Sequence, residues 1–381
     1  MENAITLFPK YEVKGTLVSI HISDIHFGAI DPKTEFYILK EQYIDRISIL
    51  DNIDLICIDG DLFDHKYMAN SDVVYYASEF IRLLVELCKT KGITLILLHG
   101  TYSHDSNQLK LFYHYLQDPY IDIRIVETIK FEVVKGVRVL CIPELYNIDE
   151  SIYQQYLFYS GIYELCIIHG TIEGSVYGNN VGQSRLFTIE DFINCSGPII
   201  GGHIHTGGCF NSHFYYCGSP IRYKFGEEEP KGYLIVLQDL ETRKYFVHKE
   251  IIESFRYDTI YLDDILSNDP KNVINYINNL KQEQNIDNLR IIFNTEIPND
   301  MILVLNNYYR SISNIKLQFE KDMKNKVLQK NMKEMNDLGD LSFVLDKSLS
   351  EYEILTKYIN FNKGYEYITV DKLKELLEEE I

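Results

Sequence analysis

The chain has 381 residues, of which 46% are hydrophobic and 24% charged, and these globular values exclude a wholly disordered protein. Lys and Arg number 37 against 56 Asp and Glu, which gives a formal net charge of −19. A chain this acidic is not held on nucleic acid by its net charge, so a polyanionic substrate needs a bound metal or a partner's basic surface. The length indicates two or three folding units.

The seven cysteines form no CxxC pair, and Cys57, Cys141 and Cys166 lie within apolar runs. This favours buried thiols in a reducing compartment over a zinc cluster or a set of disulfides. The N-terminus has no basic segment followed by an apolar one, and no apolar run is long enough to span a bilayer. We therefore expect a soluble, cytoplasmic protein with no membrane association, in the host cytoplasm if the source is viral.

Short apolar β runs alternate with helical stretches through the first 250 residues. The expected strands cover residues 16–23, 54–58, 93–98, 137–142, 165–168 and 198–200. Helical apolar spacing covers residues 36–50 and 73–90, and each stretch is followed by a break. This alternation predicts a layered α/β domain, and a hairpin of residues 233–238 and 244–249 is expected to close one of its sheets.

The rest of the chain predicts a second, smaller α+β unit and a polar linker. Its expected order is strand 256–262, helix 271–284, strand 288–293, helix 299–311 and strand 315–319. The predicted organisation is therefore a main domain over 1–250, a small domain over 251–320, a linker over 321–344 and a helical tail over 345–381. In the tail, Val370, Leu373 and Leu377 form one apolar stripe, which packs either on a partner or on this chain's own core.

Polar residues follow five of the expected strands, at the edge where open α/β sheets bind ligands. They are Asp24 and His26; Asp61; Ser103, His104 and Asp105; His169; and His203 and His205. Residues i and i+2 of a strand point to the same side, so two side chains of a DxH or HxH motif can reach one site. Carboxylates mixed with imidazoles suit Mn²⁺, Fe²⁺ or Zn²⁺ better than Mg²⁺, and two such ions can clamp a phosphate.

Each of these motifs also has a plainer explanation when taken alone. Asp24 and His26 could cap the following helix, and Asp61 could be a structural turn residue. The two histidines of the HxH motif could be ordinary residues at a strand end. The order and placement of all five motifs together favour the metal site.

The motif order DxH, GD, HD, HG and GHxH resembles that of the calcineurin-like metallophosphoesterases. The resemblance implies a four-layer αββα sandwich and two metal ions bridged by Asp61. It implies that Asp24, His26, Asp61 and His205 bind the first ion, that Asp61, Ser103, His169 and His203 bind the second, and that His104 and Asp105 are catalytic, His104 as the acid for the leaving group. One departure is GTYSHD at 100–105, where Ser103 stands in place of the family's Asn ligand and binds directly, through water, or weakly.

Two further segments are similar to the SbcD-type DNA-repair nucleases: GDLFD at 60–64, and YCGSPIR at 216–222 followed by FGE at 225–227 and KG at 231–232. This similarity implies a DNA exonuclease (3′–5′) and single-strand endonuclease that works in repair and recombination, with two Mn²⁺ ions or, alternatively, Fe²⁺ or Mg²⁺. It also implies a homodimer whose C-terminal helices dock on an SbcC-like coiled-coil ATPase. Arg222 and His65 would contact the substrate, although Arg222 could instead pair with Glu227 or Glu228 and stiffen its loop.

Two other functions are compatible with the same motifs. The first is a metallophosphoesterase that acts on nucleotides or phosphoproteins, which would need neither the GSPIR segment nor the C-terminal extension. The second is a non-catalytic scaffold of the same fold, which the Ser103 departure keeps open.

Overall fold

The computed structural model describes residues 15–175, 185–227, 229–264, 267, 269–295 and 297–319. The expected linker 321–344 and helical tail 345–381 lie outside the described residues. The chain divides into two compact units between Asp258 and Thr259. Each unit is described by itself below.

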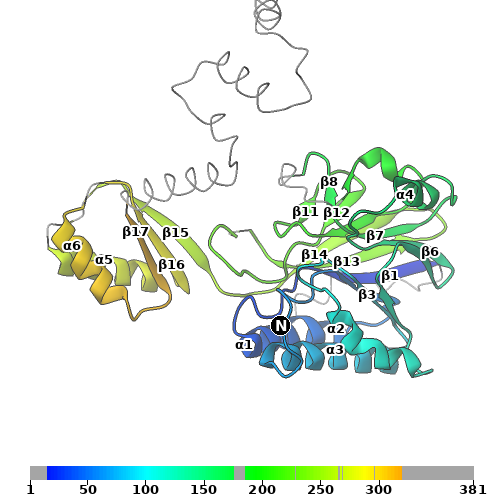
Figure 1. Cartoon of the computed structure of the whole chain (residues 1–381), viewed down its shortest axis with the longest axis horizontal. Helices are drawn as coiled ribbons and strands as arrows, with labels where there is room; N and C mark the ends of the chain where they lie inside the picture. Colours follow the sequence, from blue (N-terminus) through cyan, green and yellow to red (C-terminus); the bar gives the residue numbers. More distant parts are fainter. Residues whose placement is uncertain are drawn as a thin grey trace, which may run out of the picture. The chain divides into compact units, whose positions relative to one another are not determined.

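The first unit is built on two six-stranded sheets (Figure 1). The first sheet has the order β14-β13-β1-β2-β3-β4 and the second has the order β11-β12-β10-β7-β6-β5. The strands of the first sheet are β1 Thr16–Ile22, β2 Leu55–Asp59, β3 Thr94–Leu98, β4 Ile123–Val126, β13 Gly232–Asp239 and β14 Tyr245–Ile251. Those of the second are β5 Lys130–Val134, β6 Val137–Ile142, β7 Leu165–His169, β10 Ile199–Gly202, β11 Gly208–Cys209 and β12 Phe214–Tyr216. The short strands β8 Thr171–Ile172 and β9 Leu186–Phe187 pair separately.

The helices of this unit flank the sheets. They are α1 Pro32–Leu39, the π-helical turn η1 Lys40–Ile44, α2 Asp45–Ser48, α3 Asp72–Lys91, the 3₁₀ segment η2 Gln108–Gln117, α4 Glu150–Leu157 and the 3₁₀ turn η3 Ile189–Phe192. In α3, the Ser71 side chain caps the N-terminus and Gly92 ends the helix in the left-handed conformation. Within the part of the chain that the structure describes, no helix is both long and apolar enough to cross a membrane.

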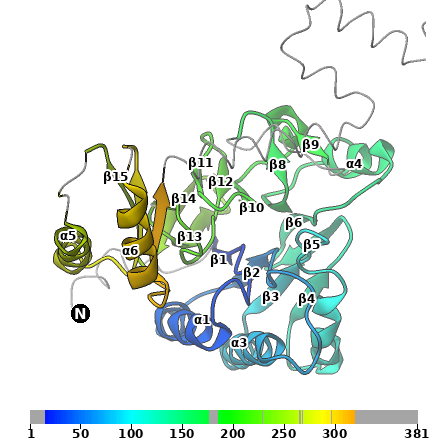
Figure 2. The same cartoon turned by 60° about the vertical axis from the view of Figure 1, so that its left-hand side comes forward.

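Alternate residues of each central strand face different cores, which fixes the layer order. In β2, Ile56 and Ile58 pack with the helices α1 and α3, whereas Leu55 and Cys57 pack against the second sheet. In β7 of the second sheet, Leu165 and Ile167 face the first sheet, whereas Cys166 and Ile168 face the side of α4. Figure 2 shows α1 and α3 covering the outer side of the first sheet. The predicted four-layer αββα sandwich is therefore confirmed.

Parallel pairing brings the carboxyl ends of the central strands to one edge. Strand β1 pairs in parallel with β2, and β2 with β3. Strand β10 pairs in parallel with both β7 and β12. The hairpin β13–β14 joins the first sheet because β13 runs antiparallel to β1. Strand β6 also pairs in parallel with β7, so the loops after β1, β2, β3, β6, β7 and β10 can build a site.

The second unit is a three-stranded sheet with two helices. Its elements are β15 Tyr257–Leu262, α5 Pro270–Glu283, β16 Asn288–Phe293, α6 Asn299–Tyr309 and β17 Ile315–Phe319. The sheet order is β15-β16-β17, and β16 and β17 run parallel. Apolar side chains of both helices pack on the sheet, among them Ile277 and Leu305, which are fully buried. The element order predicted from the sequence is confirmed.

Candidate metal centre

The predicted ligands of five different loops converge on one place. Three groups of ligand atoms each lie within 4.8 Å of one another: Asp24, His26 and His205; His26, Asp61 and His104; and Asp61, His169 and His203. The first two groups share His26, and the last two share Asp61. The three groups therefore form one continuous cluster at the carboxyl edge of both sheets.

The first part of the cluster is centred on His26 and His205. Their Nε2 atoms lie 3.0 Å apart, and His26 Nε2 lies 3.7 Å from Asp61 Oδ2. The Nε2 atom of His205 lies 3.9 Å from Asp24 Oδ1. Burial lowers the pKa of His26 to about 4, so its imidazole is neutral at neutral pH and offers a lone pair. Its buried Nδ1 lies 3.9 Å from Asp64 Oδ1 and makes no hydrogen bond with any described residue.

The second part of the cluster is centred on Asp61 and His169. Oδ2 of Asp61 lies 3.3 Å from Nε2 of His169, and the Nδ1–H of His169 donates to the Asp59 carbonyl at 2.8 Å. Burial by itself would lower the pKa of His169, but the Asp61 charge outweighs it and raises the pKa well above the usual range. Burial would raise the pKa of Asp61, and its ion pair with His169 reverses this and lowers it. A divalent ion bound between the two would take the place of the proton that they share here.

Four of the clustered residues have a left-handed backbone. The φ angles are 51° at Asp24, 51° at His26, 53° at Asp61 and 89° at His203. Such a conformation costs a non-glycine residue roughly 1–3 kcal/mol and occurs mostly at functional sites. Hydrogen bonds between loops hold it in place, since Asp24 N donates to the Gly60 carbonyl at 3.1 Å and His203 N donates to Asp24 Oδ1 at 3.0 Å. Four of the ten described non-glycine residues with positive φ thus belong to this cluster.

Glycine is needed at two positions around Asp61. A Cβ at Gly100 would overlap the backbone nitrogen and the carboxylate of Asp61. A Cβ at Gly60, whose φ is +95°, would overlap the imidazole of His169. These two glycines let the loops after β2 and β3 approach closely enough to enclose the carboxylate.

The predicted catalytic pair His104 and Asp105 has two different environments. The Nδ1 atom of His104 is hydrogen-bonded to the Asp64 carbonyl, and its ring centroid lies 4.6 Å from that of His26. Asp105 is fully buried, and its carboxylate accepts hydrogen bonds from four backbone N–H groups: Gly100 at 2.8 Å, Leu62 at 2.9 Å, Asp61 at 3.1 Å and Phe63 at 3.2 Å. Burial and the neighbouring Asp61 raise the pKa of Asp105 to about 6. These contacts tie the loop after β2 to the loop after β3.

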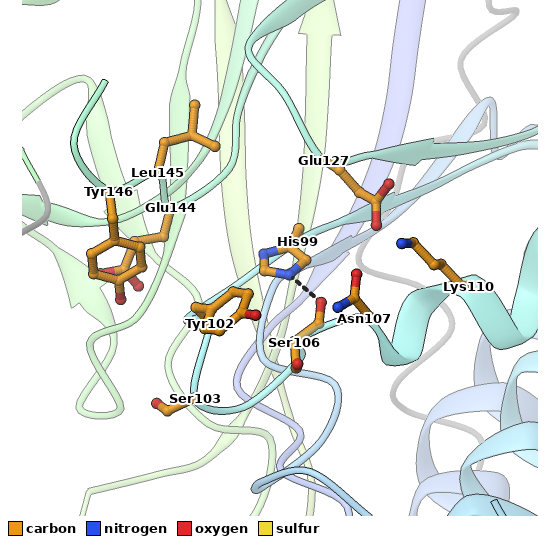
Figure 3. A pocket seen from close by; sticks show the side chains of 10 residues that line it. All are labelled: His99, Tyr102, Ser103, Ser106, Asn107, Lys110, Glu127, Glu144, Leu145 and Tyr146. Atoms are coloured by element: carbon orange, nitrogen blue, oxygen red, sulfur yellow. Dashed lines mark hydrogen bonds between the residues drawn. The ribbon is translucent and has the colours of Figure 1, made fainter. Parts of the chain in front are cut away.

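Ser103, the residue in the family's Asn position, is not among the described residues that contact Asp61. It is exposed and lines a cavity of about 780 Å³ together with Tyr102, Glu144 and Tyr146 (Figure 3). Thr101, two residues earlier, contacts the cluster. Its N–H donates to Asp61 Oδ1 at 2.6 Å, and its hydroxyl lies 3.2 Å from Asp61 Oδ2 and 3.4 Å from His169 Nε2. A role for Ser103 as a ligand stays a prediction.

Glu144 is a carboxylate that the sequence analysis did not single out. It follows β6 and is 6% exposed. Its Oε2 atom accepts a hydrogen bond from the Thr101 hydroxyl at 2.8 Å and lies 3.7 Å from His203 Nδ1. A signal was present in the sequence, because the strand expected over 137–142 ends two residues before Glu144, at the same edge as the five motifs.

Residues of the segment that follows the GHxH motif contact the side chain and the backbone of His205. Oε1 of Glu227 lies 3.4 Å from His205 Nδ1, and the buried Lys231 donates from Nζ to the His205 carbonyl at 2.8 Å. Burial would lower the pKa of His205, and its hydrogen bond to Glu227 raises it instead. The hydroxyl of Tyr223 donates to the Ile25 carbonyl, within the DxH motif. The segment 216–232 is therefore part of the wall of the cluster.

The two predicted substrate contacts lie outside the three groups of ligand atoms. Arg222 lines a second cavity of about 500 Å³, among residues that include Arg256 and Asp258 but none of the predicted metal ligands. Its guanidinium donates to the carbonyl of Glu229 at 3.3 Å. His65 is exposed and bonds through Nδ1 to the Asp64 carboxylate at 2.8 Å. Contact of either residue with a substrate stays a prediction.

The donor set fits divalent transition metals. Five imidazoles and two carboxylates provide the ligand atoms of the three groups, and all of these side chains are buried or half-buried. Zinc, manganese and iron accept such mixed nitrogen and oxygen sets.

Comparisons with known proteins agree with this chemistry. No curated protein matches the chain. Nineteen chains of solved structures match; one of them, a crystal structure, has 12% sequence identity and a TM-score of 0.38, over 61% of this chain and 99% of that one, and a similarity this low carries no argument. Residues 18–207 match the sequence model of the calcineurin-like phosphoesterases, a match that contains the predicted ligands from Asp24 to His205. The chain therefore contains a calcineurin-like phosphoesterase domain, which belongs to a family of metal-dependent hydrolases of phosphoester bonds.

Proposed function

We propose that the protein is the nuclease subunit of an SbcCD-like DNA repair and recombination complex, and that it cleaves DNA phosphodiesters with two Mn²⁺ ions. In this proposal it is a 3′–5′ exonuclease and a single-strand endonuclease. One observation favours DNA over other phosphoesters as the substrate. The segment 216–232, which is similar to SbcD-type nucleases, contacts His205 through Glu227 and Lys231 and so belongs to the site itself.

The roles proposed for the residues follow the geometry. Asp24, His26, Asp61 and His205 hold one ion, and Asp61, His169 and His203 hold the other. When bound, the pair of ions polarises the phosphodiester and lowers the pKa of the attacking water. His104, fixed by the carbonyl of Asp64, gives a proton to the departing 3′ oxygen. Asp105 positions the loops that carry Asp61 and His104.

The cavity of about 780 Å³ is proposed to receive one nucleotide unit of the DNA. Glu144 lines it and also contacts Thr101, which touches Asp61, so the cavity adjoins the metal centre. The ring of Tyr102 is 58% exposed there and offers a stacking surface for a base (Figure 3). Lys110 at the far side supplies a positive charge for a phosphate.

The net charge of −19 limits what the chain can do alone. Two divalent ions offset only four of these negative charges, so we expect the isolated protein to bind duplex DNA weakly at ordinary salt. The proposal therefore includes a partner with a basic groove, an SbcC-like coiled-coil ATPase that binds through residues 345–381, and a homodimer of this chain.

The decisive experiment compares substrates with Mn²⁺ present. Cleavage of single-stranded DNA and of linear duplex DNA from the 3′ end is measured beside hydrolysis of bis-p-nitrophenyl phosphate, with and without a coiled-coil ATPase. The proposal expects DNA cleavage that His104→Ala abolishes and that the ATPase stimulates. Turnover confined to the small substrate would favour a phosphoesterase for nucleotides or phosphoproteins. No turnover of any substrate, with fewer than one bound ion per chain, would favour a scaffold.

A further inference from the structure

The third motif of this chain departs from its family at the residue that would bind the second ion. Ser103 is exposed, and the hydroxyl of Thr101 occupies the space beside Asp61 and His169. A threonine hydroxyl is a weak ligand, so without another donor the second site consists of Asp61, His169 and His203. The first site, in contrast, has two carboxylates and two imidazoles.

We propose that Glu144 is a ligand of the second metal ion and replaces the oxygen donor that the third motif lacks. The inference rests on the proposed two-metal function and goes beyond it, because it assigns the ion a ligand outside the five motifs. Oε2 of Glu144 lies 3.7 Å from Nδ1 of His203. Two ligands of one ion lie roughly 3–3.5 Å apart when each bond is about 2.1 Å long. Glu144 is near this distance from His203 but is not among the ligand atoms that lie within 4.8 Å of one another around Asp61, so its side chain has to move towards Asp61 and His169 to complete the set.

The burial of Glu144 supports a ligand over a passive side chain. It is 6% exposed, and its charge is aimed at the cluster from the end of β6. Thr101 donates to it at 2.8 Å. One neutral hydroxyl offsets only part of the cost of burying a carboxylate, and a divalent cation would offset more of it. The same hydroxyl would hold the carboxylate in place as a ligand.

With Glu144 included, the two sites have matching donors. The first has Asp24, Asp61, His26 and His205, and the second has Asp61, Glu144, His169 and His203. Each divalent ion is then surrounded by two carboxylates and two imidazoles, with Asp61 common to both. Ser103 faces the adjoining cavity and is free to contact the substrate instead.

The test counts bound Mn²⁺ and measures affinity by calorimetry, with electron paramagnetic resonance to detect a coupled pair of ions. Wild type is compared with Glu144→Leu, which keeps the volume without a donor atom, with Glu144→Gln, and with the control Ser103→Ala. We expect two ions and a coupled signal in wild type and in Ser103→Ala. In Glu144→Leu we expect the first ion unchanged, the second weakened at least about tenfold, and the coupled signal lost. Glu144→Gln, which keeps a neutral oxygen, should lie between them.

The outcomes separate this inference from the proposed nuclease function. Two ions of unchanged affinity in Glu144→Leu, in a chain whose metal-free melting temperature is that of wild type, would overturn the inference and leave the nuclease proposal standing. If Glu144→Leu failed to fold, two ions of unchanged affinity in Glu144→Gln would overturn the inference instead. Two ions that depend on Glu144, without any DNA cleavage, would support the inference and contradict the nuclease. Fewer than two ions in wild type would overturn both.

Discussion

The Nε2 atoms of His26 and His205 face each other at 3.0 Å, although 179 residues separate them in the chain. Without metal, one of the two nitrogens has to carry a hydrogen for the contact to be favourable. Both rings are held from behind, His205 by Glu227 and His26 by the strained backbone of the DxH loop. The folded chain therefore holds two nitrogen donors in readiness for an ion.

Metal binding should stabilise the protein measurably. Mn²⁺ at about 100 times its dissociation constant adds roughly 2.7 kcal/mol per site to the free energy of unfolding. For a domain of this size that corresponds to a rise in melting temperature of about 5–10 °C. Differential scanning fluorimetry with Mn²⁺, and again after EDTA, measures the rise and its reversal. Identical melting curves in both conditions would contradict a metal centre.

His104→Ala should separate metal binding from catalysis. The ring of His104 is anchored to the Asp64 carbonyl rather than held by a carboxylate, as suits a group that transfers a proton. We expect kcat for DNA to fall roughly 10²–10⁴-fold, with two Mn²⁺ ions still bound. Metal analysis of the same sample provides the control. Loss of one ion in this variant would show that His104 is instead a ligand.

The main effect of Asp105→Ala should be a loss of folding stability. It removes the acceptor of four backbone N–H groups and leaves them unpaired in a buried place. We expect the free energy of unfolding to drop by about 3 kcal/mol or more, read from urea denaturation of the metal-free protein. A loss below 1 kcal/mol would mean that water replaces the carboxylate easily.

Tyr102→Ala tests whether the cavity beside Glu144 receives a base. Stacking on an aromatic ring contributes about 1–3 kcal/mol per base, so KM for single-stranded DNA should rise roughly 5–150-fold. Hydrolysis of bis-p-nitrophenyl phosphate, which has no nucleobase, should be unchanged. Tyr120→Ala is the matched control, because Tyr120 is 78% exposed and does not line the cavity. Equal effects of both substitutions on DNA would count against the cavity.

Much of the fold could be predicted because its central strands are buried on both faces. The runs over 16–23, 54–58 and 93–98 correspond to β1, β2 and β3, which are continuous apolar segments. Strand β4, Ile123–Val126, was missed because it is short and carries an arginine in its middle. Strand β12 has only three residues, too few to show a period. The helix expected over 36–50 is broken by the turn Lys40–Ile44, and such a turn leaves the apolar spacing nearly unchanged.

The residues of the site that belong to local sequence motifs could be predicted. Asp24, His26, Asp61, His169, His203 and His205 each lie next to an apolar strand, and the structure brings them together. The contacts of Thr101 with the site arise only from tertiary packing, whereas Glu144 follows an expected strand at the same edge as the five motifs. The backbone of the loop after β3 decides whether residue 101 or residue 103 touches Asp61, and no spacing rule contains that information.

The ionisation of the Glu35 side chain should make the stability of the protein depend on pH. The side chain is fully buried in α1, where it accepts hydrogen bonds from Gly28 N at 3.2 Å and Tyr223 Oη at 3.3 Å. Burial raises the pKa of Glu35 well above its ordinary value of 4.5. At pH values between these two, the folded chain keeps a proton that the unfolded chain has released. The folded state binds more protons there, so the free energy of unfolding falls as the pH rises.

Glu35→Gln removes this dependence because glutamine stays neutral at every pH. The melting temperature of the variant relative to wild type should therefore increase as the pH rises above the ordinary value of 4.5 towards the raised pKa of Glu35. Thermal unfolding of both proteins, in the metal-free state and at several pH values, gives the difference curve. Glu41→Gln, at an exposed position of the following turn, should give a flat curve. A flat curve for Glu35→Gln as well would mean that the folded protein ionises Glu35 as easily as the unfolded chain does.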